Sequence, residues 1–156
     1  MFFVAGCQPG FTSTPGNQNN KKYVIVDDSS VRLDWDYNPD GRTVREVDLL
    51  YNQGGGAVTV ARWRFDPPAQ NLQVNAASGY NSSRVEFSPR ATFIINNIVA
   101  SDSRTFTCKV SFTSFDPPDI SSSVELVVVG KYPYQYYYNN KRLFVAFTWA
   151  VNSLKA

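Results

Sequence analysis

Histidine is absent from this chain of 156 residues, and cysteine occurs only twice. Without an imidazole, the chain has no Ser-His-Asp triad, no histidine switch near neutral pH and few of the ligands that zinc sites use. Two cysteines permit at most one internal disulfide, and whether Cys7 and Cys108 pair stays open at this point. These absences predict a protein that is not an enzyme, binds no metal and needs no cofactor.

Charge and long apolar runs are also scarce. Charged residues make up 18% of the chain, the formal net charge is +2, and lysine and arginine are scattered along the sequence. A nucleic-acid-binding domain shows a clustered basic stripe, so no nucleic-acid partner is expected. No run reaches the roughly 18–20 apolar residues that cross a bilayer. Membrane attachment is therefore expected only through a segment that is missing or truncated here.

Short strands separated by turns are what the sequence does contain. From residue 31 to residue 37, the apolar side chains of Val31, Leu33 and Trp35 alternate with polar ones, which indicates a half-buried strand. No helical periodicity of useful length is present, so we expect an all-β fold of two antiparallel sheets packed as a sandwich. Further strands are predicted over residues 23–26, 44–51, 58–65, 70–74, 83–87, 91–97, 105–112 and 121–129.

Composition divides the chain into three spans. Residues 8–21 are rich in Gly, Pro, Ser, Thr, Asn and Gln, and we expect residues 1–21 to form a loose N-terminal arm with room for a first edge strand. Residues 22–130 hold the folded domain. Residues 131–156 begin with a tyrosine-rich stretch and end in an apolar run of about half a bilayer span. Two interpretations of this tail stay open, a truncated membrane segment and an artefact of the gene prediction.

The most informative motif spans residues 102–108, Asp-Ser-Arg-Thr-Phe-Thr-Cys. It is similar to the Asp-x-Gly-x-Tyr-x-Cys corner of immunoglobulin variable-type domains, and residues 92–98 are similar to the strand before that corner. Residues 31–35 resemble the second strand of such domains, and residues 84–88, Arg-Val-Glu-Phe-Ser, resemble the fourth. From about residue 23 to residue 130 the chain therefore resembles a variable-type (V-set) domain of the immunoglobulin superfamily, whose usual work is binding.

Several positions depart from the pattern of the family, so the resemblance is to a divergent member. Trp35 stands where the first disulfide cysteine is expected, which implies that the inter-sheet disulfide is missing and that Cys108 is reduced and buried. Leu49 stands at the position of the core tryptophan, and Phe106 replaces the corner tyrosine. Domains of this kind resemble polymorphic surface receptors of cnidarians and other invertebrates, a comparison prompted by residues 35–43.

Three residues around the corner have roles that the resemblance or a local motif predicts. Arg84 and Asp102 match the ion pair that closes one end of variable-type sandwiches, which is a structural role. Asn81 heads the only Asn-x-Ser/Thr sequon in the sequence. If the protein is secreted, Asn81 is a candidate for glycosylation, and the alternative is an ordinary loop asparagine.

Candidate binding residues gather on two consecutive predicted strands. Tyr51, Arg62, Trp63 and Arg64 combine aromatic and basic side chains, which are favoured anchors of protein interfaces. The alternative places Trp63 or Phe65 in the core, because these residues alternate with the arginines. Five carboxylates lack a nucleophilic or basic partner nearby and are expected on a solvated face. They are Asp34, Asp36, Asp40, Glu46 and Asp48.

The sequence therefore favours an extracellular or cell-surface binding module that acts in cell–cell recognition or adhesion. Its expected partner is a protein, either a second copy of this chain or a related immunoglobulin-like domain. Two alternatives stay open: a structural immunoglobulin-like domain of an intracellular scaffold, which the missing disulfide would suit, and a secreted immune-type binding protein. A hydrolase on a sandwich scaffold is disfavoured, because the chain lacks histidine and a nucleophile elbow.

Overall fold

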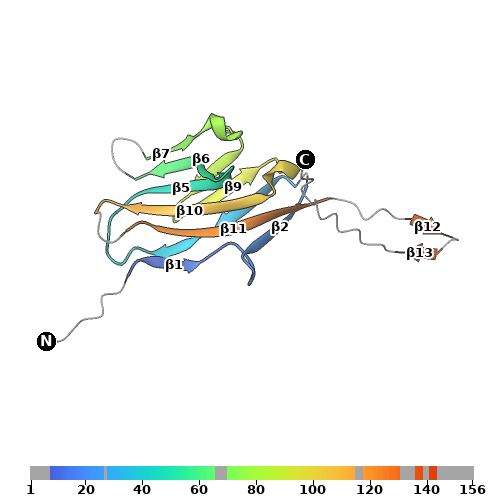
Figure 1. The fold of residues 1–156 in the computed structure, drawn as a ribbon, viewed down its shortest axis with the longest axis horizontal. Helices are drawn as coiled ribbons and strands as arrows, with labels where there is room; N and C mark the ends of the chain where they lie inside the picture. The colour runs from blue at the N-terminus through green and yellow to red at the C-terminus, as the bar shows by residue number, and fades with distance from the viewer. Residues whose placement is uncertain are drawn as a thin grey trace.

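Two β-sheets packed face to face form the body of the structure, a computed structural model (Figure 1). It describes residues 8–26, 28–65, 70–114 and 118–130, together with the backbone of residues 136–138 and 141–143. Two single-turn 3-10 helices, η1 (Ala76–Ser78) and η2 (Ala100–Asp102), lie in loops. The strands are β1 (Gly10–Ser13), β2 (Lys21–Ile25), β3 (Ser30–Asp34), β4 (Asp36–Asn38), β5 (Val44–Gln53), β6 (Gly56–Arg64), β7 (Asn71–Val74), β8 (Val85–Ser88), β9 (Thr92–Asn96), β10 (Arg104–Phe112), β11 (Ile120–Val129), β12 (Tyr136–Tyr138) and β13 (Lys141–Leu143).

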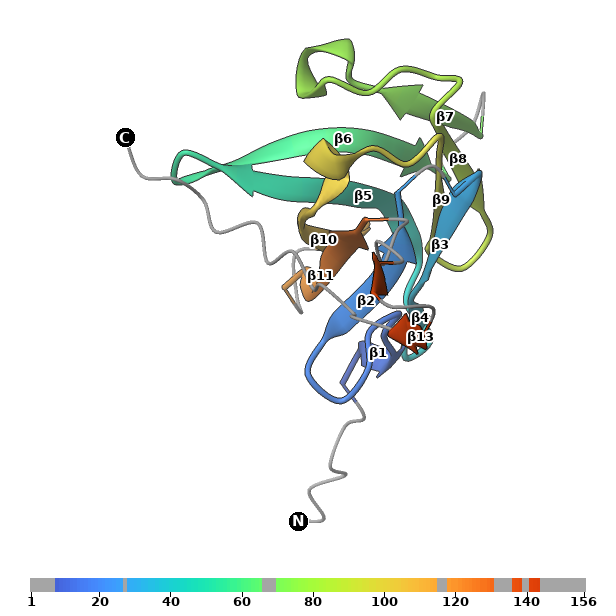
Figure 2. The same ribbon diagram turned by 90° about the vertical axis from the view of Figure 1, so that its right-hand side faces the viewer.

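The larger sheet has the strand order β2-β11-β10-β5-β6-β7. Its neighbouring strands pair antiparallel, except that β2 and β11 run parallel. The smaller sheet has the order β3-β9-β8, and β1 pairs with β4, which continues β3 after Trp35. Seen from the end, β3, β8 and β9 form one layer beside β5, β6 and β10 (Figure 2). The predicted all-β sandwich is confirmed.

Both flanking spans contain short strands. β1 lies within residues 1–21 and pairs with β4, and its Phe11 packs edge-on against Tyr37 with ring centroids 6.4 Å apart. This part of the N-terminal span is therefore an edge strand. At the other end, β12 and β13 pair with each other and with no other described strand. The rest of residues 131–156 lies outside the described residues, and so does Cys7.

The core follows from the alternation of side chains along the strands. Every second residue from Val47 to Tyr51 on β5 and from Phe106 to Phe112 on β10 is an apolar side chain buried in the core. These two rows pack with residues of the smaller sheet, such as Phe93, in one apolar cluster. Full burial of a large apolar side chain stabilises the fold by roughly 1.5–3 kcal/mol, so this cluster is the main source of stability.

The two sheets are joined without a disulfide in the described part of the chain. Leu49 on β5 lies directly opposite Cys108 on β10, and both are fully buried. Trp35, at the position expected for the first disulfide cysteine, is only 1% exposed, and its indole Nε1 has no hydrogen-bond partner among the described residues. Cys108 is a free thiol. Burial, and then the negative charge of Asp48, raise the pKa of this thiol, so it is uncharged.

Asp102 is a buried charge that anchors one end of the sandwich, with an exposure of 1%. Arg84 Nη2 donates to its Oδ2 at 2.7 Å, the Tyr80 hydroxyl donates to its Oδ1 at 2.8 Å, and the Val99 backbone N–H donates to Oδ2 at 2.9 Å. Arg84 also donates to two backbone carbonyls at and just after the end of β9. Every charge in this cluster is therefore paired, as a buried ionised group requires.

Tyr80 supplies a hydroxyl at the corner where Phe106 has none. Phe106 is fully buried and packs edge-on against Tyr80, with ring centroids 6.3 Å apart. Burial, and then the hydrogen bond to Asp102, raise the pKa of Tyr80, which keeps its hydroxyl a donor. No motif in the sequence indicated this role for Tyr80. Its one local signal is the preceding Gly79, whose φ of 83° turns the chain after η1.

We expect Cys108 to remain a reduced thiol that is not bonded to Cys7, because Cys108 lies at 0% exposure in the core. Mass spectrometry of the unreduced protein should find no cross-linked peptide that contains both cysteines. Iodoacetamide should modify Cys108 only after unfolding. A Cys7–Cys108 peptide, or complete alkylation of Cys108 in the native protein, would show this expectation to be wrong.

Replacement of Asp102 should be far more damaging than an ordinary surface change. Asp102→Ala leaves the Arg84 guanidinium and the Tyr80 hydroxyl without their shared acceptor, so we expect the free energy of unfolding to fall by about 2–4 kcal/mol. Denaturant unfolding measures the loss. Glu86→Ala is the control, since Glu86 is exposed on the smaller sheet and should change stability by no more than about 0.5 kcal/mol. An equally small loss for Asp102→Ala would contradict the role of the pair.

Candidate binding face

The larger sheet turns one face away from the core. On β5 and β10, the side chains on this face alternate with the buried rows described above. We call this surface the outer face. It comprises Glu46, Asp48 and Leu50 on β5, Arg62 and Arg64 on β6, Thr105, Thr107, Lys109 and Ser111 on β10, and Ser121, Ser123 and Glu125 on β11.

A two-pronged ion pair joins β5 and β6 on the outer face. Arg62 Nε donates to Asp48 Oδ1 at 2.7 Å, and Arg62 Nη2 donates to Asp48 Oδ2 at 2.9 Å. Asp48 is only 4% exposed, because the guanidinium covers it. The hydrogen bond to Asp48 is also the main reason why the pKa of Arg62 is raised. This bidentate geometry holds the guanidinium flat across the two strands.

The Glu46 carboxylate forms ion pairs with three arginines. Its Oε2 lies 3.6 Å from the Nε atoms of both Arg62 and Arg64, and Arg45 Nη2 lies 3.4 Å from its Oε1. Glu46 is 8% exposed, whereas the side chains of Arg45 and Arg64 are 42% and 48% exposed. The Glu46 carboxylate thus lies beneath the guanidinium groups. These groups face solvent, and each has more N–H donors than its ion pair with Glu46 uses.

The prediction that five carboxylates lie on a solvated face is wrong for two of them. Glu46 and Asp48 are buried, since arginines from the neighbouring strand cover them. Asp34 and Asp36 do lie at the surface, with side chains 50% and 41% exposed. Asp40 is partly exposed in the turn after β4. A strand pattern alone does not show which neighbouring side chains will cover a carboxylate.

A second ion pair lies toward β11. Lys109 Nζ is 2.8 Å from Asp119 Oδ2, and the Ser111 hydroxyl donates to the same oxygen at 2.9 Å. Burial alone would raise the pKa of Asp119, but the hydrogen bonds from Lys109 and Ser111 outweigh it and lower the pKa. Asp119 is therefore ionised at neutral pH and completes the charged part of the outer face.

Two predicted binding residues point the other way. Tyr51 is 4% exposed, and its hydroxyl donates to the Ser78 carbonyl at 3.1 Å inside the domain. Trp63 stacks on Phe87 of the smaller sheet with ring centroids 4.8 Å apart. The prediction that Tyr51 and Trp63 present their rings to a partner is wrong, because both lie on the core side of the sheet. Of the predicted set, Arg62 and Arg64 face solvent.

Asn81 lies apart from the outer face, in an exposed turn between η1 and β8. Its Oδ1 accepts hydrogen bonds from the Ser83 backbone N–H at 3.1 Å and from the Ser83 hydroxyl at 2.7 Å. The sequon is therefore folded into a tight turn at the surface.

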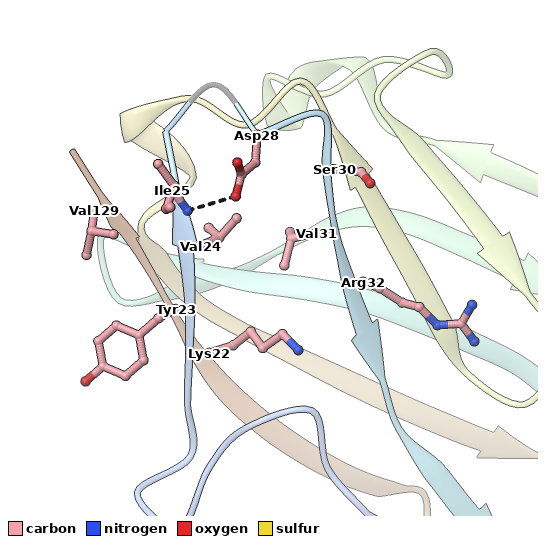
Figure 3. Close-up of a pocket in the computed structure, with 9 residues that line it drawn as sticks. All are labelled: Lys22, Tyr23, Val24, Ile25, Asp28, Ser30, Val31, Arg32 and Val129. Carbon is pink, nitrogen blue, oxygen red and sulfur yellow. Dashed lines mark hydrogen bonds between the residues drawn. The ribbon is translucent and has the colours of Figure 1, made fainter. Parts of the chain in front are cut away.

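A groove of about 430 Å³ opens between the edges of β2 and β3, where the two sheets separate (Figure 3). Val24 and Val31 point into it from opposite sides, and Lys22 extends into the gap from β2. At one end, Asp28 Oδ2 accepts a hydrogen bond from the Ile25 backbone N–H at 3.1 Å. No nucleophile is hydrogen-bonded to a base among the lining residues, so the groove offers no arrangement for covalent catalysis.

Within the described ranges, no three His, Cys, Asp or Glu side chains come together as metal ligands. None of the described helices is long and apolar enough to cross a membrane.

Similar structures show what kind of sandwich this is. No protein-family model matches the chain, and no curated protein matches it. Murine CRIg superposes with a TM-score of 0.62 at 19% identity, covering 78% of this chain and 98% of that chain. The two tandem V-type regions of VCBP3, a v-region-containing chitin-binding protein, give a TM-score of 0.55 at 16% identity over 78% and 46% of the chains. The extracellular domain of the voltage-gated sodium channel β4 subunit gives 0.52 at 19% identity over 72% and 92%.

At these identities, the likeness establishes the fold. The strands β6 and β7 extend the larger sheet beyond β5, as the two additional strands of a variable-type sandwich do. The resemblance to invertebrate surface receptors stays a prediction. The chain has the fold of an immunoglobulin variable-type domain, and Cys108 stands in it without a disulfide partner among the described residues.

Proposed function

We propose that this chain is an extracellular binding module that acts in cell–cell recognition or adhesion and contacts a protein partner through the outer face. The placement of Arg62 and Arg64 carries the proposal. Their side chains are 32% and 48% exposed. The buried carboxylates of Glu46 and Asp48 hold them in position on β6, which is not an edge strand. Preordered arginines lose little side-chain freedom on binding, and arginine is enriched among the residues that dominate interfaces.

Two of the similar structures support a recognition role. The sodium channel β4 subunit is described as acting in cell–cell adhesion through homodimers of its extracellular domains. VCBP3 is described as a chitin-binding protein with V-type regions. A partner for the present chain would be a second copy or a related immunoglobulin-like domain, and the protein would be located outside the cell or at its surface. A secreted immune-type binding protein would use the same face.

The free thiol favours a second candidate, a structural domain of an intracellular scaffold. Cytosolic proteins rarely hold disulfides, and Cys108 is buried and unpaired with any described residue. Glycosylation distinguishes the two candidates, because only a protein that has passed through the secretory pathway carries a glycan on a sequon.

Charge reversal on the outer face should weaken binding. With the domain displayed in clustered form on beads, Arg62→Glu and Arg64→Glu should each reduce aggregation, or capture of a related domain, by about tenfold or more. Arg64→Glu is the cleaner variant, because Arg62→Glu also leaves the buried Asp48 unpaired. Circular dichroism confirms that each variant is folded.

Arg32→Glu is the matched control for this assay. Arg32 is an exposed arginine of the smaller sheet that pairs with Asp34, as Arg64 pairs with Glu46. Its reversal should leave bead aggregation unchanged. If Arg64→Glu also leaves binding unchanged in a folded domain, the binding face is misplaced.

Asn81 should carry an N-linked glycan in protein isolated from its own cells. A glycosidase that removes N-glycans should then lower the apparent mass on a gel. In a secreted recombinant chain, Ser83→Ala should abolish this shift, and Ser82→Ala should preserve it, because the middle position of the sequon is free to vary. An unmodified Asn81 in the native protein would favour the intracellular scaffold.

A further inference from the structure

One side of the sandwich is open, where the edges of the two sheets do not pair. β2 is an edge strand of the larger sheet and β3 is an edge strand of the smaller sheet, and their neighbours are β11 and β9. The groove of about 430 Å³ lies between these two edges (Figure 3). It is separate from the arginines of the outer face, because β2 and β6 lie toward opposite edges of the larger sheet.

The free edge of β3 carries backbone groups that can pair with a further strand. The Trp35 N–H donates to the Ala91 carbonyl at 3.3 Å, which places the odd-numbered residues of this stretch against β9. In an antiparallel pair, such residues alternate with residues whose N–H and C=O groups point away from the neighbour. The backbone groups of Ser30 and Arg32, both of which line the groove, therefore point away from β9 and toward the opening.

The free edge of β2 faces the same opening. The Val26 N–H donates to the Val129 carbonyl at 2.8 Å, so the even-numbered residues of this stretch face β11. The N–H and C=O groups of Tyr23, in the middle of β2, point the other way, toward the groove. Packed sheets lie about 10 Å apart and paired strands about 4.8 Å apart, so one added strand can bridge the edges of two packed sheets.

The side chains that point into the groove are apolar at one level and cationic at the next. Val24 and Val31 point into it from opposite sides, with exposures of 7% and 4%. Lys22 precedes Val24 by two residues, so it lies on the same side of β2, and its side chain extends into the gap (Figure 3). No carboxylate among the described residues forms an ion pair with Lys22. A lysine in this position deters a neutral or basic strand and favours an acidic one.

The groove has an acidic end near the connection between β2 and β3. Asp28 Oδ2 accepts a hydrogen bond from the Ile25 N–H, and the Asp28 N–H donates to the Ile25 carbonyl, both at 3.1 Å. These bonds occupy the backbone groups of Ile25 that would otherwise face an added strand. The negative charge of Asp28 also disfavours a second carboxylate at this end, so an acidic side chain belongs at the level of Lys22.

From these features we infer that the groove binds an extended acidic peptide of a partner protein, which adds to β3 as a further strand. The peptide runs antiparallel to β3, the direction of stronger pairing, and exchanges backbone hydrogen bonds with Ser30 and Arg32. One apolar side chain enters between Val24 and Val31, and a glutamate two residues earlier meets the Lys22 ammonium.

The order of these two peptide residues follows from the strand directions. Lys22 lies farther than Val24 from the connection between β2 and β3, and the peptide runs toward that connection. The recognised pattern is therefore Glu-x-Val, in which Val stands for a small apolar residue. This inference goes beyond the proposed function, because it concerns a second site that does not use the outer face.

Titration of the full chain with a synthetic peptide tests the inference. The probe is acetyl-Ser-Thr-Glu-Thr-Val-Thr-amide, and NMR measures the hydrogen exchange of single backbone amides. At saturating peptide, the amides of Ser30 and Arg32 should exchange about tenfold more slowly, because both become donors to the added strand. The amide of Phe87 is the control, since it points away from β9 at the other edge of the smaller sheet and should be unchanged. Unchanged exchange at Ser30 and Arg32 would overturn the inference.

Two altered peptides separate the side-chain contact from the backbone contact. Lysine in place of the glutamate should weaken binding by about tenfold or more, because two ammonium groups then meet at Lys22. N-methylation of the threonine between glutamate and valine removes the N–H that pairs with β3, and should weaken binding by a similar factor. A methylated peptide that binds like the parent would overturn the added strand, since the groove would then recognise only a carboxylate.

Charge reversal in the protein should reverse the choice of peptide. Lys22→Glu should bind the lysine peptide at least tenfold better than the glutamate peptide. Lys21→Glu is the matched control, because Lys21 lies on the opposite side of β2, where it pairs with Glu125, and this variant should keep the wild-type preference. Thermal unfolding checks that both variants are folded. A folded Lys22→Glu variant that still prefers the glutamate peptide would overturn the site.

Other occupants of the groove give different results. Slow exchange of the Ser30 and Arg32 amides in the chain alone, at every concentration, would mean that another part of the same chain fills the groove. Slow exchange that appears only as the concentration of the chain rises would mean that a second copy does. Either result overturns a partner peptide as the occupant, and neither affects the bead assay of the outer face.

Discussion

No disulfide joins the two sheets within the described part of the chain, so packing and fully paired buried charges hold them together. A disulfide that closes a loop of about 70 residues would stabilise the fold by roughly 4 kcal/mol in the chain-entropy model. Here Cys108 lies in one apolar cluster with buried Leu49 and Trp35, and burial of one such side chain stabilises the fold by roughly 1.5–3 kcal/mol. The cluster around Asp102 then closes one end, because Arg84 and Tyr80 satisfy a carboxylate that is almost fully buried. The other features of the sandwich depend on this non-covalent joint.

Buried and paired charges also occur on the outer face, where the partners of the carboxylates are exposed arginines. Asp48 and Glu46 are buried by arginines, not by apolar side chains, so the cost of removing their charges from water is offset by guanidinium hydrogen bonds. The consequence is a surface whose arginines are held in position before any partner arrives. A binding module benefits from this arrangement because its contact residues lie on strands and not on mobile loops. The same carboxylates thus stabilise the sheet and, in the proposed function, hold the binding residues in position.

Much of the fold could be predicted from local patterns. The alternation around Val31 and Leu33, the turn residues between strands and the motif at residues 102–108 are all local properties, and each of them survives in the structure. The ion pair of Arg84 with Asp102 could be predicted from the resemblance to variable-type domains. The role of Tyr80 was not, since its hydroxyl reaches Asp102 from a loop 22 residues earlier in the chain. The burial of Glu46 and Asp48 could not be predicted from the sequence either, because it depends on side chains of a neighbouring strand.

The sequence by itself determined the sandwich, its strand order along the chain and the absence of histidine chemistry, because these depend on composition and on a repeat of two residues. Only the tertiary structure decided which side of β6 faces the solvent. A strict alternation would put Val60 and Arg62 on one face, but the pairing of β5 with β6 shifts by one residue between Leu49 and Leu50, so that Val60 and Ala61 are both buried. That bulge turns Trp63 inward onto Phe87 and leaves Arg62 outward on Asp48. The two-residue repeat of a strand divides its side chains into two sets on opposite faces. Packing against the opposite sheet decides which set is buried and which set faces water.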